Sequence, residues 1–255
     1  MSAINLSYDG AIAVLTVSNE AKLNALTTAM LDALEGHLGR IDRSTDTVAV
    51  IVIGVGDTAF CCGADISEWG ALSPAEFARI WVRDGHRIFD RLARLSKPTI
   101  CALNGHAFGG GLELAAACDI RVMTPRATLA LPEAKVGIVP GWSGTQRLMR
   151  LLPEPVGKEM ALFGRRISAE RALGVGFIAE VAEDVLGAAK HIAADLVGVS
   201  PRATEIAKAM IHGAVGEDRG AAIEALGSAA AGASADRDEG VDAFLNKRSP
   251  RFTGQ

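Results

Sequence analysis

Two short apolar runs, each followed by a glycine-containing loop, most constrain the fold of this chain. Residues 48–53 (VAVIVI) and 99–103 (TICAL) have the continuous apolar character of parallel strands that are buried on both faces. Between them, Ser73 and Glu76 form a capping box with proline at the first helical position, which predicts a helix to about Leu95. Strands that alternate with helices in this way predict an α/β fold with crossover connections.

The rest of the first 130 residues extends the same pattern. Residues 4–8 and 12–17 flank the turn dipeptide Asp9-Gly10, which predicts a hairpin. Thr27 or Thr28 is expected to cap a helix whose apolar residues recur at helical spacing, namely Met30, Leu31, Leu34 and Leu38. We expect a loop of small residues over 54–65, a helix over 110–117, and strands near 120–123 and 128–130.

Composition excludes several classes of protein. The chain has 255 residues, of which 49% are hydrophobic, and a formal net charge of −4, so it is not a disordered chain. Its longest apolar run is far shorter than the roughly 20 residues that span a bilayer. A pI near 5.8 without a Lys/Arg run argues against nucleic-acid binding. Because the first residues lack the pattern of a secretory signal, we expect a cytoplasmic protein that binds neither nucleic acid nor membrane.

Metal and redox chemistry are not indicated either. The four cysteines lack metal-ligand spacing, and we expect them to be small, buried and reduced: Cys61, Cys62, Cys101 and Cys118. The five histidines show no H-E-x-x-H or i, i+4 pairing. The sequence therefore predicts no metal site.

The glycine loop after residues 99–103 points to a site for negative charge. Gly109, Gly110 and Gly111 follow one another, and the predicted helix begins near Gly110. Consecutive glycines let a ligand approach backbone N–H groups, and a helix start leaves such groups unpaired. A phosphate or a developing oxyanion suits this environment. The spacing matches neither G-x-G-x-x-G nor a Walker loop.

Two glutamates near this loop are candidates for acid–base chemistry. Glu113 lies one turn into the predicted helix among apolar residues, and Glu133 follows 20 positions later beside Pro132. Each also has a structural interpretation, as an exposed helix residue and as a helix cap respectively. If both faced one cleft, their titrations would be coupled, which gives one acid and one base.

Weaker candidates lie close by. The segment 141–144 (GWSG) misses the nucleophile-elbow pattern G-x-S-x-G by one residue, and His106 is expected to be a hydrogen-bonding loop residue. The residues by themselves therefore indicate an oxyanion-type site with one or two glutamates.

Seven segments of the chain, in order, resemble the enoyl-CoA hydratase/isomerase (crotonase) superfamily. They are 22–26 (KLNAL), 63–66 (GADI), 104–119 (NGHAFGGGLELAAACD), 132–141 (PEAKVGIVPG), 144–148 (GTQRL), 167–169 (ISA) and 239–248 (EGVDAFLNKR). The resemblance implies a spiral of β-β-α turns over residues 1–195, followed by a C-terminal helical oligomerisation region over 196–255. It also implies a homotrimer or a dimer of trimers.

The resemblance implies a role for each residue of the candidate site. The N–H groups of Ala64 and Gly110 would bind the thioester carbonyl. Glu113 would deprotonate the water that adds at C3, Glu133 would deliver a proton to C2, and the Gly141 N–H would lie near the water. This is the chemistry of a hydro-lyase that converts a trans-2-enoyl-CoA thioester to a 3-hydroxyacyl-CoA.

The resemblance also places coenzyme A, which is part of the substrate, so no separate cofactor is expected. The residues implied to hold it are Lys22, Ala64, Asp65, Ile66, Phe244 and Lys247, the last two often from a neighbouring subunit. The chain departs from the family pattern in two places. Trp142-Ser143 replaces two small residues beside the site, and Ser67 stands where a lysine is common. We expect Trp142 to restrict or select the acyl group.

Two other functions stay open from the sequence. One is a different crotonase-type reaction on a CoA thioester, such as double-bond isomerisation, decarboxylation, dehalogenation or thioester hydrolysis. The other is a non-catalytic acyl-CoA-binding or scaffold protein, against which the presence of both glutamates and both glycine loops argues.

Overall fold

A computed structural model describes residues 2–216, 235–236, 239, 242–243 and 246–255 of the chain. The chain divides into two compact units, Met1–Pro201 and Arg202–Gln255, which we describe separately. The predicted division at residues 195 and 196 into a spiral core and an oligomerisation region stays a prediction.

A six-stranded sheet forms the frame of the first unit, in the order β1-β2-β3-β5-β7-β10. The predicted hairpin is confirmed, with β1 (Ala3–Asp9) antiparallel to β2 (Ile12–Ser18). The remaining strands are parallel: β3 (Ala49–Gly54), β5 (Thr99–Leu103), β7 (Ile120–Met123) and the short β10 (Glu180–Val181). The two apolar runs are therefore neighbouring central strands, as their composition predicts.

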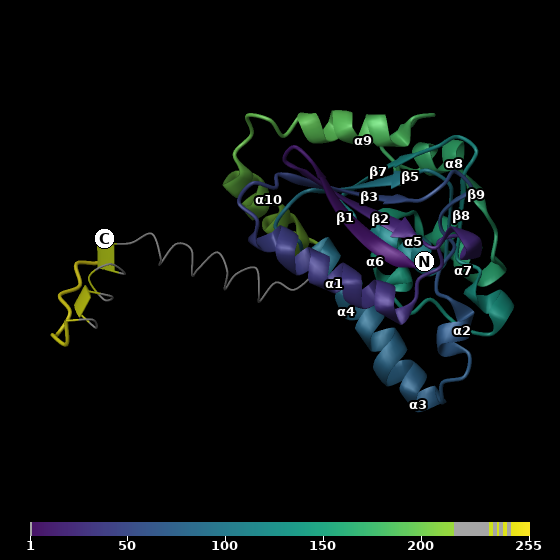
Figure 1. Ribbon diagram of the computed structural model, residues 1–255, viewed down its shortest axis with the longest axis horizontal. Coiled ribbons are helices and arrows are strands. Elements are labelled where there is room, and N and C mark those ends of the chain that lie inside the picture. Colours follow the sequence, from purple (N-terminus) through teal and green to yellow (C-terminus); the bar gives the residue numbers. More distant parts are fainter. Residues whose placement is uncertain (1, 217–234, 237–238, 240–241, 244–245) are drawn as a thin grey trace. The chain divides into compact units, whose positions relative to one another are not determined.

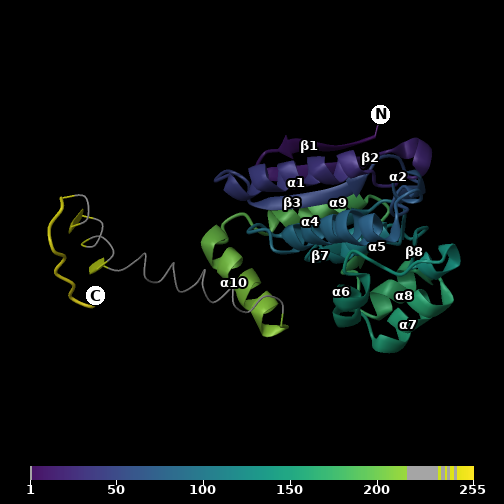
Figure 2. The ribbon, with the colours of Figure 1, turned by 90° about the horizontal axis from the view of Figure 1, so that it is seen from below.

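Helices cover both faces of this sheet, which explains why its central strands are apolar on both sides. Val50 and Val52 of β3 belong to the core on the side of α1 (Thr28–Arg43) and α4 (Arg83–Ala93). Ile51 belongs to a second core beneath α9 (Val185–Ala194). Figure 1 shows α9 on one side of the sheet and α1 with α4 on the other, and Figure 2 looks at the sheet from the side of α1 and α4.

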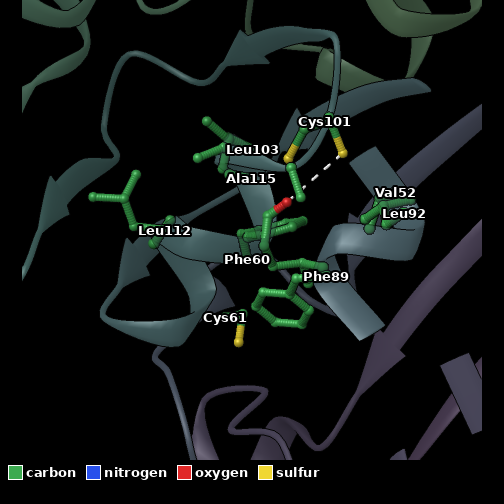
Figure 3. Packing of buried hydrophobic residues seen from close by; sticks show 14 of the residues in the cluster. Val52, Phe60, Cys61, Phe89, Leu92, Cys101, Leu103, Leu112 and Ala115 are labelled. Atoms are coloured by element: carbon green, nitrogen blue, oxygen red, sulfur yellow. Dashed lines mark hydrogen bonds between the residues drawn. The ribbon is translucent and has the colours of Figure 1, made fainter. Parts of the chain in front are cut away.

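The larger core joins the sheet to the helices that carry the candidate site. Phe60 and Phe89 are fully buried in it, together with Leu103 of β5 and Leu112 of α5 (Gly110–Ala116). Figure 3 shows these side chains gathered around Phe60. The start of α5 is thus held by packing on several elements.

A smaller sheet of four strands lies beside the glycine loops, in the order β4-β6-β8-β9. Its strands are β4 (Ala59–Cys61), β6 (His106–Phe108), β8 (Thr128–Ala130) and β9 (Ile167–Ser168). The prediction that 54–65 is only a loop is wrong at β4, which becomes a strand by pairing in parallel with β6. Since β4 leads to Ala64 and β6 leads to Gly110, this pairing brings the two loops together.

The helices begin and end largely where the sequence predicts. Thr27 caps α1 by accepting the N–H of Met30 at 3.3 Å. Ser73 and Glu76 form the predicted capping box at the start of α3 (Pro74–Glu76). The helix continues through η2 (Phe77–Val82) into α4, which ends at Ala93, two residues before the predicted end. Residues Phe77–Val82 are π-helical, a form that the apolar spacing does not predict.

The other elements of the first unit are helical. They are η1 (Glu20–Lys22), α2 (Ile66–Trp69), η3 (Glu133–Val136), α6 (Gly144–Leu151), α7 (Glu154–Phe163) and α8 (Ala169–Gly174). Within the described residues, no helix has the length and apolar character needed to cross a membrane.

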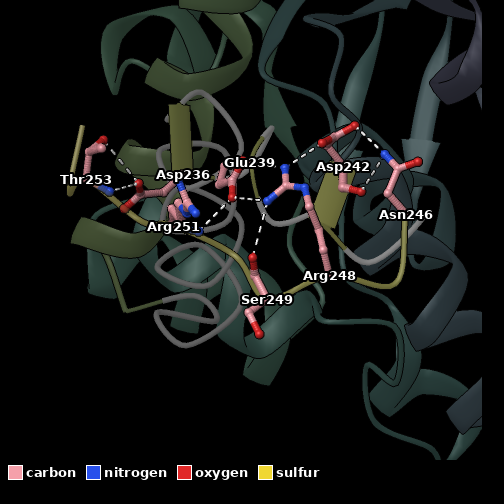
Figure 4. A network of polar contacts seen from close by, with 8 residues as sticks. All are labelled: Asp236, Glu239, Asp242, Asn246, Arg248, Ser249, Arg251 and Thr253. Carbon is pink, nitrogen blue, oxygen red and sulfur yellow. Dashed lines mark hydrogen bonds and ion pairs between the residues drawn. The ribbon is translucent and has the colours of Figure 1, made fainter.

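The described part of the second unit contains α10 (Pro201–Ala214) and a polar network near the C-terminus. Arg248 donates to Glu239 Oε1 at 2.6 Å and Oε2 at 2.8 Å, and it also bonds Asp242 (Figure 4). The Arg248 guanidinium and the N–H of Arg251 lower the pKa of Glu239 to about 2. Residues 246–255 are therefore tied by a charge-assisted set of bonds within their own unit.

Candidate active site

A pocket of about 200 Å³ opens where the two glycine loops meet. Six of the residues proposed from sequence line it: Ala64, Ile66, Gly110, Glu113, Glu133 and Gly141. They come from five places in the chain, namely the loop after β4, the start of α2, the start of α5, η3 and the loop before α6. The fold therefore brings together the five catalytic candidates that are far apart in sequence.

The backbone segments at Ala64 and Gly110 lie close together, and both line this pocket. Leu26 donates to the carbonyl of Gly63 and accepts the N–H of Asp65, both at 2.8 Å. Since successive groups of an extended backbone point to opposite sides, the Ala64 N–H points away from Leu26. A Cβ on Gly110 would lie 3.6 Å from the Ala64 nitrogen, so the two N–H groups are close. Gly110 begins α5, and its N–H has no acceptor within that helix.

Glu113 is held in one orientation by the loop that precedes α6. Its Oε1 accepts the N–H of Trp142 at 2.7 Å and the N–H of Gly144 at 2.6 Å. The absence of a side chain at Gly144 permits this approach, because a Cβ there would lie 2.7 Å from Oε1. Glu113 is 3% exposed, which excludes the exposed-helix interpretation.

Glu133 faces the same pocket from the first position of η3. Its Oε2 is buried and has no hydrogen-bond partner in the part of the chain that the structure describes. Gly109, at φ 52°, makes room for Oε1, since a Cβ there would lie 2.8 Å away. The unpartnered oxygen is free to meet a group that enters the pocket.

The pKa values of both carboxyls are raised, which favours their neutral forms. Burial raises the pKa of Glu113 to about 7, the charge of Glu133 adds to this, and the N–H groups of Trp142 and Gly144 oppose it. Burial also raises the pKa of Glu133 to about 7. Near neutral pH, one carboxyl can therefore give a proton while the other accepts one.

The residues that the resemblance assigns to coenzyme A do not all line the pocket. Lys22 lies next to the pocket residues, where its Nζ bonds Asp65 Oδ2 at 2.6 Å and Ser67 Oγ at 3.1 Å. The Lys22 ammonium and the Ser67 hydroxyl lower the pKa of Asp65. Lys247 lies in the second unit, and Phe244 lies outside the described residues.

Sequence reasoning missed one wall of the pocket. Trp69, Phe77, Trp81 and Val82 line it from α2 and from the π-helical segment. Phe77 and Trp81 are four residues apart, so the helical spacing shows that they share a face but not what that face contacts. Trp142, which the sequence singled out, lies beside them in the same wall.

The weaker candidates have structural partners. His106 accepts the N–H of Thr128 at Nδ1 at 3.0 Å, as expected of a hydrogen-bonding loop residue. The hydroxyl of Ser143 lies 3.1 Å from Nδ1 of His86 on α4. Cys61, Cys101 and Cys118 are buried, Cys62 is half-buried, and all four are free thiols. Within the described ranges, no group of three His, Cys, Asp or Glu side chains could hold a metal ion.

Comparison with known proteins agrees with this arrangement. A short-chain-enoyl-CoA hydratase of Clostridium acetobutylicum is 35% identical over 97% of this chain and 96% of its own length. A 2,3-dehydroadipyl-CoA hydratase of Escherichia coli K12 is 34% identical over the full length of both. The crystal structure of an enoyl-CoA hydratase from Bacillus anthracis superposes with a TM-score of 0.80 at 34% identity, covering 99% of each chain.

The fold is therefore that of the crotonase-type enzymes among these structural neighbours. Residues 7–255 match the model of the enoyl-CoA hydratase/isomerase family. The chain belongs to this enzyme family, as its sequence resemblance predicts.

Proposed function

We propose that this protein is a hydro-lyase that adds water to a trans-2-enoyl-CoA and releases a 3-hydroxyacyl-CoA. One observation carries the proposal: two buried carboxyls, Glu113 and Glu133, line one pocket and each has a pKa near 7. The pocket also presents the backbone N–H groups of Ala64 and Gly110. Hydration needs a base, an acid and a site for negative charge on oxygen, and these groups supply them.

In the proposed reaction, ionised Glu113 takes a proton from water while the water oxygen bonds C3. Oε1 of Glu113 accepts hydrogen bonds from two backbone N–H groups. These bonds stabilise the ionised carboxylate and fix its orientation. Gly141 is one residue before Trp142 and lines the pocket, so its N–H is assigned to the same water.

As the new bond forms, the electrons of the C2–C3 double bond move toward the thioester and negative charge develops on its oxygen. The N–H groups of Ala64 and Gly110 are assigned to that oxygen. Donors of this kind are preorganised by the fold, and losing one costs about 2.7–4 kcal/mol of barrier in comparable sites. Only a proline would remove either donor, and it would also restrict the backbone there, so the carboxyls offer the sharper test.

Protonated Glu133 then gives its proton to C2, which restores the carbonyl and completes the addition. Glu113 has gained one proton and Glu133 has lost one, so exchange with solvent returns the site to its starting state. The unpartnered Oε2 of Glu133 supports this role, because a buried oxygen without a partner is costly until a reacting group meets it.

For the coenzyme A part of the substrate, we assign Lys22, Ala64, Asp65 and Ile66, together with Phe244 and Lys247, which the resemblance often places on a neighbouring subunit. The bond between Lys22 and Asp65 supports this, because it fixes an ammonium beside the pocket while Lys22 stays 52% exposed. A homotrimer or dimer of trimers in the cytoplasm is part of the same proposal. The exposed apolar side chains of Leu162 and Phe163 on α7 are consistent with a subunit contact. Light scattering of the purified chain tests the assembly.

The test of the reaction uses the full chain with crotonyl-CoA. Hydration is followed as loss of the absorbance of the conjugated thioester, and the product is identified by mass spectrometry. Glu113→Gln and Glu133→Gln keep the shape of each side chain and remove its titration, and each is expected to lower kcat by about 10²–10⁴-fold. Glu170→Gln, at an exposed position of α8, is the matched control and should leave kcat unchanged.

Two results would argue against the hydratase assignment. If no member of a panel of 2-enoyl-CoA thioesters is hydrated, the proposal fails. If a 3-enoyl-CoA is instead converted to its 2-enoyl isomer without uptake of water, the chain is an isomerase of the same family.

A further inference from the structure

The indole of Trp142 packs closely against other residues of the pocket wall. Its Nε1 donates to the carbonyl of Trp81 at 3.1 Å, at the end of the π-helical segment. Its ring contacts Trp81 with centroids 5.3 Å apart and meets Phe89 edge-on at 5.2 Å. The side chain lines the pocket and is only 3% exposed.

Two glycines border this indole from different helices. A Cβ on Gly85 of α4 would lie 2.2 Å from Nε1, and a Cβ on Gly110 of α5 would lie 2.8 Å from Cζ3. A methyl group at either position would collide with the ring. The indole therefore packs between α4 and α5 with no room to turn away from the pocket.

The ring lies beside two groups that the proposed reaction uses. One edge packs against Gly110, whose N–H is assigned to the thioester oxygen, and the backbone N–H of Trp142 bonds Glu113. With the roles proposed above for Gly110 and Glu113, the acyl carbons beyond C3 are expected next to this edge. The pocket as a whole encloses about 200 Å³, less than the 300–1,000 Å³ usual for small-molecule sites.

From this geometry we propose that Trp142 closes the acyl end of the pocket and limits the substrate to short-chain 2-enoyl-CoA thioesters such as crotonyl-CoA. The inference rests on the proposed hydratase function and adds the substrate class. An aromatic acyl group is disfavoured because Trp81 and Trp142 are already in contact at 5.3 Å, the separation of a packed pair. They leave no slot for a third ring.

The test compares crotonyl-, hexenoyl-, octenoyl- and cinnamoyl-CoA by kcat/KM. The wild type should prefer crotonyl-CoA over octenoyl-CoA by about tenfold or more, as expected when a pocket cannot take extra methylenes. Trp142→Ala should raise the ratio of octenoyl- to crotonyl-CoA activity by about 100-fold. Trp142→Phe keeps a ring but loses the Nε1 donor, so it should change the ratio by less than about tenfold.

A second variant pair tests the fit of the indole without depending on Trp142→Ala alone. Gly85→Ala should lower kcat/KM for crotonyl-CoA by about tenfold or more, because its methyl group meets Nε1. In the Trp142→Ala background the same change should cost less than about threefold, since the space is then vacant. Circular dichroism establishes that each variant is folded.

The outcomes distinguish a failure of this inference from a failure of the proposed hydratase function. If the wild type hydrates no enoyl-CoA, the proposed function is wrong. If it hydrates octenoyl-CoA as well as crotonyl-CoA, or if Trp142→Ala leaves the ratio unchanged, only the assignment of Trp142 is overturned. Cinnamoyl-CoA as the best substrate would overturn it in favour of an aromatic acyl group.

Discussion

The hydroxyl of Ser143 lies 3.1 Å from Nδ1 of His86. The backbone of Ser143 is in the left-handed region, with a φ of 81°. A residue other than glycine in the left-handed region carries a cost of about 1–2 kcal/mol, which this contact helps to offset. Ser143 stands between Trp142 and Gly144, the two residues whose N–H groups bond Glu113. We therefore expect His86 to position the carboxyl of Glu113 through the loop that holds it.

His86→Ala should loosen this loop and weaken both N–H bonds to Glu113. Because those bonds lower the pKa of Glu113, its pKa should rise, and the acidic limb of kcat/KM should move up by about half to one pH unit. His37→Ala is the matched control, since His37 bonds the Ile4 carbonyl on another side of the first unit. An acidic limb that is the same in His86→Ala and the wild type would contradict this role.

The pH dependence of the wild type follows from the two glutamates. The base Glu113 must be ionised, so activity should fall as the pH drops below its pKa of about 7. The acid Glu133 must be protonated, so activity should also fall as the pH rises above its pKa of about 7. We expect a bell-shaped profile of kcat/KM with a maximum near neutrality, measured between about pH 5 and pH 9. A profile that is flat over this range would show that neither group titrates in the reaction.

The same pKa shifts predict that the site destabilises the fold at alkaline pH. A carboxyl whose folded pKa is raised from 4.5 to about 7 stabilises the protein below pH 4.5 and loses that contribution as the pH rises through 7. Glu113→Gln should therefore be more stable than the wild type by up to about 3 kcal/mol above pH 8. The difference should vanish near pH 4. Urea unfolding at the two pH values measures it, and an equal difference at both would contradict the prediction.

Gly109 should be required for the position of Glu133. Gly109→Ala places a methyl group 2.8 Å from Oε1 at a φ of 52°, so kcat should fall by about 100-fold. Gly176→Ala is the control, because Gly176 has a φ of 75° but a Cβ there meets nothing within 4 Å. It shares the positive φ without the collision. Comparable kcat losses in the two variants would show that strain alone is responsible.

The sequence is enough to predict the elements whose signals are local. The hairpin around Asp9-Gly10, the Thr27 cap and the Ser73 capping box are all present, because each depends on residues within a few positions. Glu113 and Glu133 were predicted as site residues from their types and from a family resemblance. That both face one pocket could not be predicted from spacing, since it depends on how α5 and η3 pack.

The features that were missed depend on distant partners. Strand β4 has only three residues and exists through its pairing with β6, which comes from the other glycine loop. The π-helical turn over Phe77–Val82 and the pocket wall that it forms with Trp142 likewise join segments 60 positions apart. Periodicity describes one element at a time, so it cannot show which faces meet.

The most direct test of the two-glutamate account is the fate of solvent oxygen. Crotonyl-CoA is incubated with the full chain in water enriched in heavy oxygen, and the product is examined by mass spectrometry and NMR. The account predicts that the wild type and Glu170→Gln form 3-hydroxybutyryl-CoA with one solvent oxygen at C3. Glu113→Gln and Glu133→Gln should not form this product. Label uptake at the wild-type rate in either of these last two variants would contradict it.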